Sequence, residues 1–169
     1  MTDDLRLARR TPVAAVQQLL AIEPLLVEPD EDLLVVMRRC AQHPETRLLG
    51  VVNADHELIG VVPILRVAEA IVARAMPEAL LVDISDVADV ARFGHLVEAR
   101  MVADVMLPPA VSHPEATIAE AFREMHRRHL SGLYVVDADG RPTGYIDLLE
   151  LAMRYVDVFE REAGGAHEG

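Results

Sequence analysis

Apolar and polar positions follow the same pattern twice along the chain. Residues 49–60 read LGVVNADHELIG and residues 133–144 read LYVVDADGRPTG, so an apolar run, a polar turn and a second apolar run recur after 84 residues. Six residues are kept in both copies: Leu49, Val51, Val52, Ala54, Asp55 and Gly60 recur as Leu133, Val135, Val136, Ala138, Asp139 and Gly144. A repeated unit of this kind cannot bury its apolar face alone, so the pattern predicts two copies that pack together.

The spacing of apolar residues predicts the elements of the first copy. Helices are expected over residues 13–20, from Pro29 to about residue 42, and over 64–75, with extended segments over 25–27, 48–53 and 58–62. Pro12 suits the first turn of the first helix. The acidic residues Asp30, Glu31 and Asp32 complement the positive start of the second helix. The first copy therefore spans residues 12–75.

The second copy spans residues 102–160 and repeats this order. A helical turn is expected over 102–106, an extended piece over 109–112, strands over 132–136 and 142–146, and a last helix over 148–160. Thr117 is expected to cap a helix that reaches about residue 129, and Glu120 completes its capping box. A connector over 76–101 holds a predicted helix near 86–96, and the glycine-rich tail over 161–169 is expected to be disordered. This alternation predicts an α/β fold.

Composition narrows the classes of protein and the compartment. Cys40 is the single cysteine, and no apolar run approaches the roughly 20 residues that cross a bilayer. The start of the chain is charged, without the apolar segment of a secretory signal. We therefore expect a cytoplasmic protein with no membrane partner. The net charge of −12, with every basic residue an arginine, argues against nucleic-acid binding, which needs a basic face.

Motifs of catalysis are not found in the sequence. It contains no Gly-x-Ser-x-Gly elbow, no phosphate-binding loop and no dinucleotide fingerprint. Cys40 lies in a predicted helix beside Arg38 and Arg39, and a lone cysteine there is more typical of packing than of reactivity. We expect that the protein is not an enzyme.

The second copy resembles the CBS domain, a family named after cystathionine beta-synthase, whose members occur in tandem pairs. Its stretch VADVMLPPAVSHPEATIAEAFREMHRRHLSGLYVVDADGRPTGYIDLLEL follows the family pattern almost continuously, and the internal repeat extends the likeness to the first copy. The resemblance implies two repeats of βαββα type packed as a pseudo-twofold pair. It also implies a regulatory homodimer that acts on an effector protein. Such pairs bind ligands such as AMP, ADP, ATP or S-adenosylmethionine in clefts between the repeats.

The family's ligand positions carry over to the second copy only in part. Nucleotide-binding relatives end the second strand with Gly-h-h-Thr/Ser-x-x-Asp, where the carboxylate accepts hydrogen bonds from the ribose. Here Asp147 takes the hydroxyl position and Glu150 takes the carboxylate position. Glu150 either holds a ribose or is a solvated helix residue, and Asp147 also suits a helix cap. Tyr134 lies near the implied cleft, for base stacking or for core packing, and Val111 lies on the extended piece beside it.

The first copy departs further from the pattern. Pro63 stands at the hydroxyl position and Arg66 at the carboxylate position, so a standard adenosine site is not expected there. Arg66 would instead clamp an anion through its guanidinium group. Some relatives place basic residues before the first strand, and Arg47 keeps that charge. Both arginines are equally consistent with solvated surface positions.

Two further functions remain open. In the first, the drifted ligand positions indicate a scaffold for dimerisation or protein interaction without a ligand. In the second, the acidic groups Asp30–Asp32 and Asp83, Asp86 and Asp89 sense a divalent cation. His126 and His129 share one side of a helix, but no third metal ligand follows from the spacing. We favour the ligand sensor, and expect no resident metal.

Overall fold

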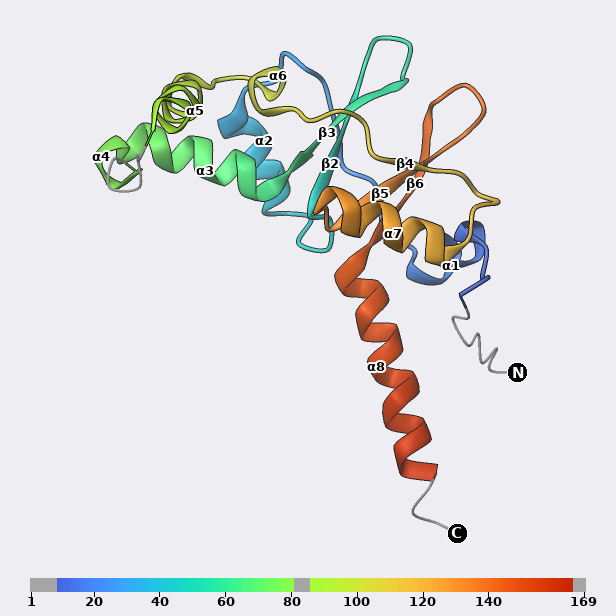
Figure 1. Ribbon diagram of the computed structural model, residues 1–169. Helices are drawn as coiled ribbons and strands as arrows, with labels where there is room; N and C mark the ends of the chain where they lie inside the picture. The colour runs from blue at the N-terminus through green and yellow to red at the C-terminus, as the bar shows by residue number, and fades with distance from the viewer. Residues whose placement is uncertain (1–8, 81–85, 166–169) are drawn as a thin grey trace. The chain divides into compact units, whose positions relative to one another are not determined.

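The chain forms two compact units in a computed structural model that describes residues 9–80 and 86–165. The continuous unit comprises residues 24–110, and the discontinuous unit combines residues 1–23 with residues 111–169. Each unit has a three-stranded sheet with helices packed against it (Figure 1). Within the described residues, no helix is both long and apolar enough to cross a membrane.

The continuous unit is built around a sheet of order β1-β2-β3. Strand β1 is parallel to β2, and β2 is antiparallel to β3. All five residues of β2 are buried, because helices cover the sheet and the hairpin's apolar positions face the core. The elements are β1 (Leu26–Val27), α2 (Leu33–Cys40), β2 (Leu48–Val52), β3 (Leu58–Pro63), α3 (Ile64–Ala75), α4 (Pro77–Leu80), α5 (Val87–Glu98) and α6 (Val102–Val105).

The discontinuous unit repeats this topology with a sheet of order β4-β5-β6. Its register is equivalent: Gly132 pairs with Asp147 where Leu48 pairs with Pro63 in the continuous unit. Each hairpin has one irregularity, between Val51 and Val52 and at the matching step of β5. The elements are α1 (Val13–Leu20), β4 (Val111–Ser112), α7 (Ile118–Arg128), β5 (Gly132–Val136), β6 (Pro142–Asp147) and α8 (Leu148–Gly165).

Each unit is completed by the short helix that precedes the other copy in the sequence. Helix α6 donates the N–H groups of Val102 and Ala103 to the carbonyls of Glu31 and Pro29 in the continuous unit. Helix α1 donates the N–H groups of its first two residues to the carbonyls of Ala116 and Pro114, the matching positions of the discontinuous unit. Val102 and Val105 are buried in one core, and Val13 and Val16 are buried in the other. The two copies therefore exchange their first helices.

The start of α7 confirms the predicted cap at Thr117, whereas α2 begins at Leu33, later than the predicted start at Pro29, and is capped by Asp32. The Asp32 carboxylate accepts the backbone N–H groups of Leu34 and Val35, at 2.8 and 3.4 Å. Thr117 and Glu120 form the capping box at the start of α7, with the Thr117 N–H donating to the Glu120 carboxylate at 2.8 Å. These local bonds satisfy N–H groups that have no partner within the helix. The capping box at Thr117 has a distinct sequence pattern, whereas a run of acidic residues before α2 does not say which of them is the cap.

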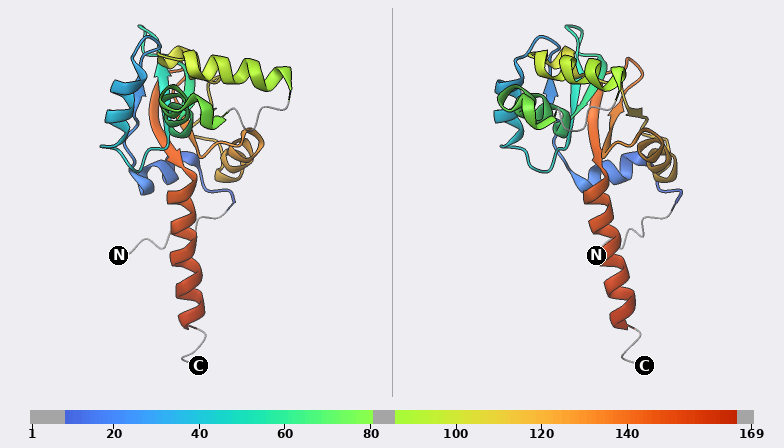
Figure 2. Two further views of the ribbon diagram at one scale, coloured as in Figure 1. Left: turned by 90° about the vertical axis from the view of Figure 1, so that its left-hand side faces the viewer. Right: turned by 60° about the vertical axis from the view of Figure 1, so that its left-hand side comes forward.

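Helix α8 runs further than expected. We predicted an end at residue 160 and disorder over 161–169, whereas α8 is helical to Gly165 and residues 166–169 lie outside the described part. The sequence from Glu160 to Ala163 consists of good helix formers, and Arg161 also donates to the Asp157 carbonyl at 3.0 Å. Figure 2 shows α8 continuing beyond the β4-β5-β6 sheet, so its second half has little of its own unit to pack against.

Candidate ligand site

In each unit, the residue before the first hairpin strand is joined to the helix that follows the hairpin. The Ile64 N–H donates to the Arg47 carbonyl at 3.0 Å, and the Leu148 N–H donates to the Ser131 carbonyl at 2.7 Å. Both partners of one bond lie 84 residues after those of the other. The loop positions and helix positions predicted to bind a ligand are thus neighbours within each unit.

We use the term half-site for the predicted ligand positions within one unit. The half-site of the continuous unit is cationic. Arg66 lies in the first turn of α3, and Arg47 precedes β2; both side chains are half-buried. The N-cap Pro63 provides no side-chain hydrogen bond to the start of α3. The Arg47 guanidinium donates to the Glu45 carbonyl at 3.4 Å. Two arginines at this loop–helix junction favour an anionic ligand, because guanidinium groups bind carboxylates and phosphates well.

In the discontinuous unit, Asp147 is the cap of α8. One carboxylate oxygen accepts the N–H groups of Leu149 and Glu150 at 2.9 and 3.3 Å, and the other accepts the Tyr145 hydroxyl at 2.9 Å. The Asp147 side chain is completely buried. Asp147 therefore has the capping role that its residue type favours, and its carboxylate contributes negative charge to this half-site.

Glu150 follows Asp147 in the first turn of α8 and is half-buried. It is the carboxylate of this half-site that retains exposed surface, because Asp147 has none. A carboxylate has acceptor capacity for two hydroxyl donors, such as those of a ribose. The two half-sites thus have opposite charges, so one ligand group does not suit both.

Tyr134 belongs to the core. Its side chain has no exposed surface, and its ring lies 5.2 Å from that of Tyr145 at 46°. The two residues also pair directly across β5 and β6. Of the two roles that the sequence left open, the structure supports core packing, because a ring with no exposed surface offers no face to a base.

Val111 lies beside Tyr134 in the sheet but is 37% exposed. It lines a pocket of about 210 Å³ together with His113, Glu120 and Glu124. None of these three residues was among the predicted ligand positions. The spacing of Glu120 and Glu124, one turn apart on α7, is the signal that could have indicated them. Both carboxylates already have partners, since Glu120 belongs to the capping box and Glu124 contacts Arg127 and Arg128.

The structure explains the other candidate groups as local features. Asp32 and Asp86 cap α2 and α5. Asp83 lies outside the described residues, among which no group of three potential metal ligands occurs. The rings of His126 and His129 lie 6.5 Å apart, and His129 ends α7 in the left-handed conformation with φ 53°.

Comparisons with known proteins agree with this fold. The family model of the CBS domain matches residues 16–73 and again residues 102–157. A CBS domain-containing protein from Thermotoga maritima superposes with a TM-score of 0.68 at 20% identity, covering 86% of this chain and 94% of that one. The CBS domain pair of protein MJ0100, solved with 5-methylthioadenosine and S-adenosyl-L-methionine, gives 0.64 at 14% identity, covering 87% and 97%. CBSX2 from Arabidopsis thaliana, solved with AMP, gives 0.59 at 17%, covering 87% and 97%. None of the curated proteins compared with the chain matches it.

Proposed function

Because the chain belongs to the CBS domain family and carries two such domains, we propose that it is a regulatory module that senses a small anionic molecule. The ligand class that we favour is an adenosine compound, such as AMP, ADP, ATP or S-adenosylmethionine. Structures of similar fold support this choice, since the MJ0100 domain pair was solved in complex with S-adenosyl-L-methionine and CBSX2 in complex with AMP. The role is regulatory rather than catalytic.

The observation that carries the proposal is the pair of equivalent loop–helix junctions. At one junction the carbonyl of Arg47 accepts the N–H of Ile64, which is two residues before Arg66 in α3. At the other, Glu150 presents a half-buried carboxylate in the first turn of α8. Within the continuous unit, a phosphate or carboxylate would bind at the arginines. Within the discontinuous unit, ribose hydroxyls would donate to Glu150.

Regulation would follow from ligand binding through a change in population. A ligand favours the conformation that it binds better, and an effector protein in the cytoplasm would respond to that conformation. The compartment is inferred from Cys40, the single cysteine of the chain, which is buried as a free thiol.

We also propose that the protein is a homodimer and that α8 provides its contact. Leu149, Ala152, Val156 and Phe159 follow the alternating spacing of three and four residues that is typical of helix pairs. Leu149 is 49% exposed, Val156 is 42% exposed and Phe159 is 64% exposed. An exposed apolar seam of this kind favours association with a second apolar surface.

A scaffold without a ligand is the second candidate function. Asp147 and Tyr134 favour it, because the structure buries both in the capping and core roles that need no ligand. Under this alternative, the chain only dimerises and binds a partner protein.

Thermal unfolding with AMP, ADP, ATP, S-adenosylmethionine, NAD and Mg²⁺ distinguishes these functions. A ligand at a hundred times its Kd adds about 2.7 kcal/mol to the free energy of unfolding, which raises the Tm by several degrees in a protein of this size. We expect a shift with at least one adenosine compound, and its loss in Glu150→Ala. Glu160→Ala, an exposed change on the same helix, is the matched control and should keep the shift.

The pattern of Tm shifts distinguishes the three functions. A shift that persists in Glu150→Ala but is lost in Arg66→Gln assigns the ligand to the continuous unit and refutes the role of Glu150. A shift with Mg²⁺ alone would identify the cation sensor. The absence of a shift with every compound contradicts the sensor and leaves the scaffold.

A further inference from the structure

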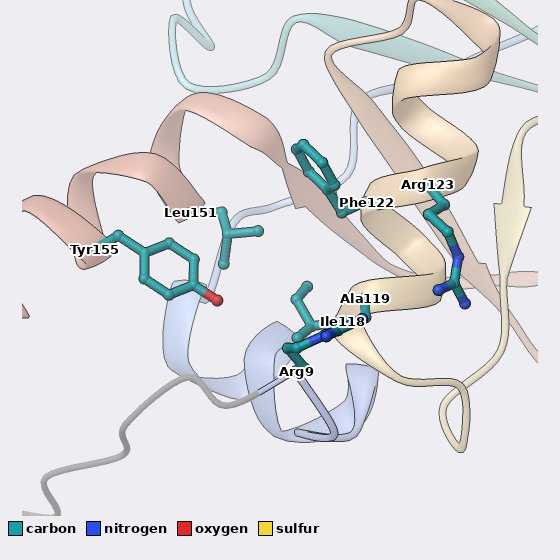
Figure 3. Close-up of a pocket in the computed structure, with 7 residues that line it drawn as sticks. All are labelled: Arg9, Ile118, Ala119, Phe122, Arg123, Leu151 and Tyr155. Atoms are coloured by element: carbon teal, nitrogen blue, oxygen red, sulfur yellow. The ribbon is translucent and has the colours of Figure 1, made fainter.

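A second pocket lies in the discontinuous unit, between α7 and the first half of α8. Its volume is about 360 Å³, which is within the range of small-molecule sites. Figure 3 shows the residues that line it, which come from α7, from α8 and from the segment that precedes α1. None of the six ligand positions predicted from sequence is among them.

Most of the pocket wall is apolar. Ile118 and Leu151 are each only 3% exposed, so they form buried parts of the wall. Phe122 is 48% exposed and Tyr155 is half-buried. Their rings lie on either side of the space, with Leu151 between them (Figure 3). Covering a large exposed phenylalanine with an apolar group is energetically favourable, so this surface favours an apolar ligand.

Both aromatic rings are held by a second ring on the same helix. Phe122 stacks on His126 with ring centres 6.2 Å apart, and Tyr155 stacks on Phe159 at 6.4 Å. Both separations lie within the range typical of aromatic pairs. Each lining ring therefore has an aromatic neighbour on its own helix.

Arginines are the charged residues in the described part of the pocket lining. Of the described residues that line the pocket, Arg9 and Arg123 are charged and none is a carboxylate. Among the described residues, neither guanidinium forms an ion pair, whereas Arg127 on the same helix pairs with Glu124. The Arg123 charge acts on Glu120, whose carboxylate is bonded to Thr117. In a chain of net charge −12, the two arginines in the described lining are a local reversal of charge.

Backbone hydrogen bonds place Arg9 at this pocket. Its carbonyl accepts the N–H of Ala119 at 3.3 Å, and the carbonyl of Thr11 accepts the N–H of Ile118 at 2.9 Å. The segment before α1 is thereby attached to the first turn of α7, and Figure 3 shows Arg9 beside Ile118. The fold thus places Arg9 next to the apolar wall, although Arg9 is far from α7 in the sequence.

We infer that this pocket binds a small organic monocarboxylate with an aromatic or medium-chain apolar body. The body lies between Phe122 and Tyr155 over Leu151, and the carboxylate is bound by the guanidinium groups of Arg9 and Arg123. Charge-assisted hydrogen bonds from arginine are the strong and specific ones for a carboxylate. A nucleotide fits less well, because the described lining offers no carboxylate for ribose hydroxyls.

The test uses 3-phenylpropionate and its neutral amide, with calorimetry and methyl NMR of the full chain. We expect saturable binding of the acid, with the amide about tenfold weaker because it lacks the charge. The methyl signals of Ile118 and Leu151 should shift on binding. Arg9→Gln should weaken the acid about tenfold, and Phe122→Ala should weaken acid and amide alike. Arg10→Gln, an adjacent exposed arginine that does not line the pocket, is the matched control and should bind normally.

Several results would overturn this inference. They are equal affinity for acid and amide, unchanged affinity in both Arg9→Gln and Phe122→Ala, or no saturable binding to a chain whose Tm is normal. Octanoate serves as a second probe, because a pocket selective for rings alone would reject it while still binding 3-phenylpropionate. The adenosine proposal is tested independently of this one. Glu150→Ala should leave 3-phenylpropionate binding intact, and Arg9→Gln should leave the Tm shift with an adenosine compound intact.

Discussion

The hydroxyl of Tyr145 donates a hydrogen bond of 2.9 Å to the carboxylate of Asp147, and both side chains have no exposed surface. The same carboxylate caps α8 through Leu149 and Glu150. Strand β6 and helix α8 are thus joined by one buried polar group. Because buried polar atoms are costly when unpaired, this junction supports the orientation of Glu150 in the first turn of α8.

Replacement of Asp147 by alanine should lower the free energy of unfolding by about 2–4 kcal/mol. The change removes a helix cap, worth about 1 kcal/mol, and leaves the buried Tyr145 hydroxyl unpaired, which costs a further 1–3 kcal/mol, roughly. Asp147→Asn should cost less, since asparagine also caps helices. Urea unfolding measures both. Equal losses in the two variants would show that the cap contributes little.

A methyl group at Gly132 should destabilise the protein by about 1–3 kcal/mol, the usual cost of overpacking a core. Its Cβ would overlap the ring of Tyr145 and approach the Ile146 carbonyl oxygen to 2.7 Å. Gly94→Ala is the matched control, because nothing lies within 4 Å of that Cβ in helix α5. It should stabilise by about 0.5–1 kcal/mol, the helix preference for alanine. Unfolding curves in urea would contradict the packing account if both changes had the same sign.

Asp104 should make the stability of the protein depend on acid. Its carboxylate accepts the backbone N–H groups of Met101 and Arg100 at 2.9 and 2.8 Å, and these bonds hold its pKa below the usual value. The folded state therefore gains stability above the unfolded pKa of about 3.9, and loses it as the pH falls through the lower folded-state pKa. Asp104→Asn should be less stable at neutral pH and less sensitive between about pH 4 and pH 2. Parallel stability–pH curves for the two proteins would contradict this.

Cys40 should react slowly with thiol reagents in the folded protein. The side chain is 4% exposed, and burial raises the pKa of its thiol, although the neighbouring Arg39 charge opposes the shift. Since the thiolate is the reactive form, modification with a disulfide reagent at neutral pH should accelerate by about a hundredfold or more in denaturant. A fast reaction in the native state would show that α2 opens readily.

The proposed homodimer predicts that a charge on the α8 seam separates the protomers. Val156→Glu should weaken association by about a hundredfold or more, because a carboxylate in an apolar interface is poorly solvated. Sedimentation velocity measures the change. Val87→Glu, at a valine that is 85% exposed on α5, is the matched control and should leave association intact. A wild-type protein that stays monomeric at high concentration would contradict the homodimer.

The candidate ligand site was only partly predictable. Asp147 and Glu150 were placed at the start of α8 because the hairpin pattern locates the end of β6 within one residue. The burial of Tyr134 was not predictable, since alternation along β5 does not say that both faces of this strand are covered. The pocket with Arg9, Phe122 and Tyr155 was missed, because these residues lie far apart in the chain and belong to no motif.

By itself, the sequence determined the repeat, the order of helices and strands, the cap at Thr117, and the resemblance to the CBS domain. These features depend on apolar periodicity and on hydrogen bonds between residues a few positions apart, which any local stretch of sequence records. Only the tertiary structure decided that α1 completes the discontinuous unit and α6 the continuous one. It also decided that Arg9 meets α7. Such contacts join segments roughly 70 to 110 residues apart. They depend on which apolar surfaces fit together, and this cannot be predicted from the local spacing of residues.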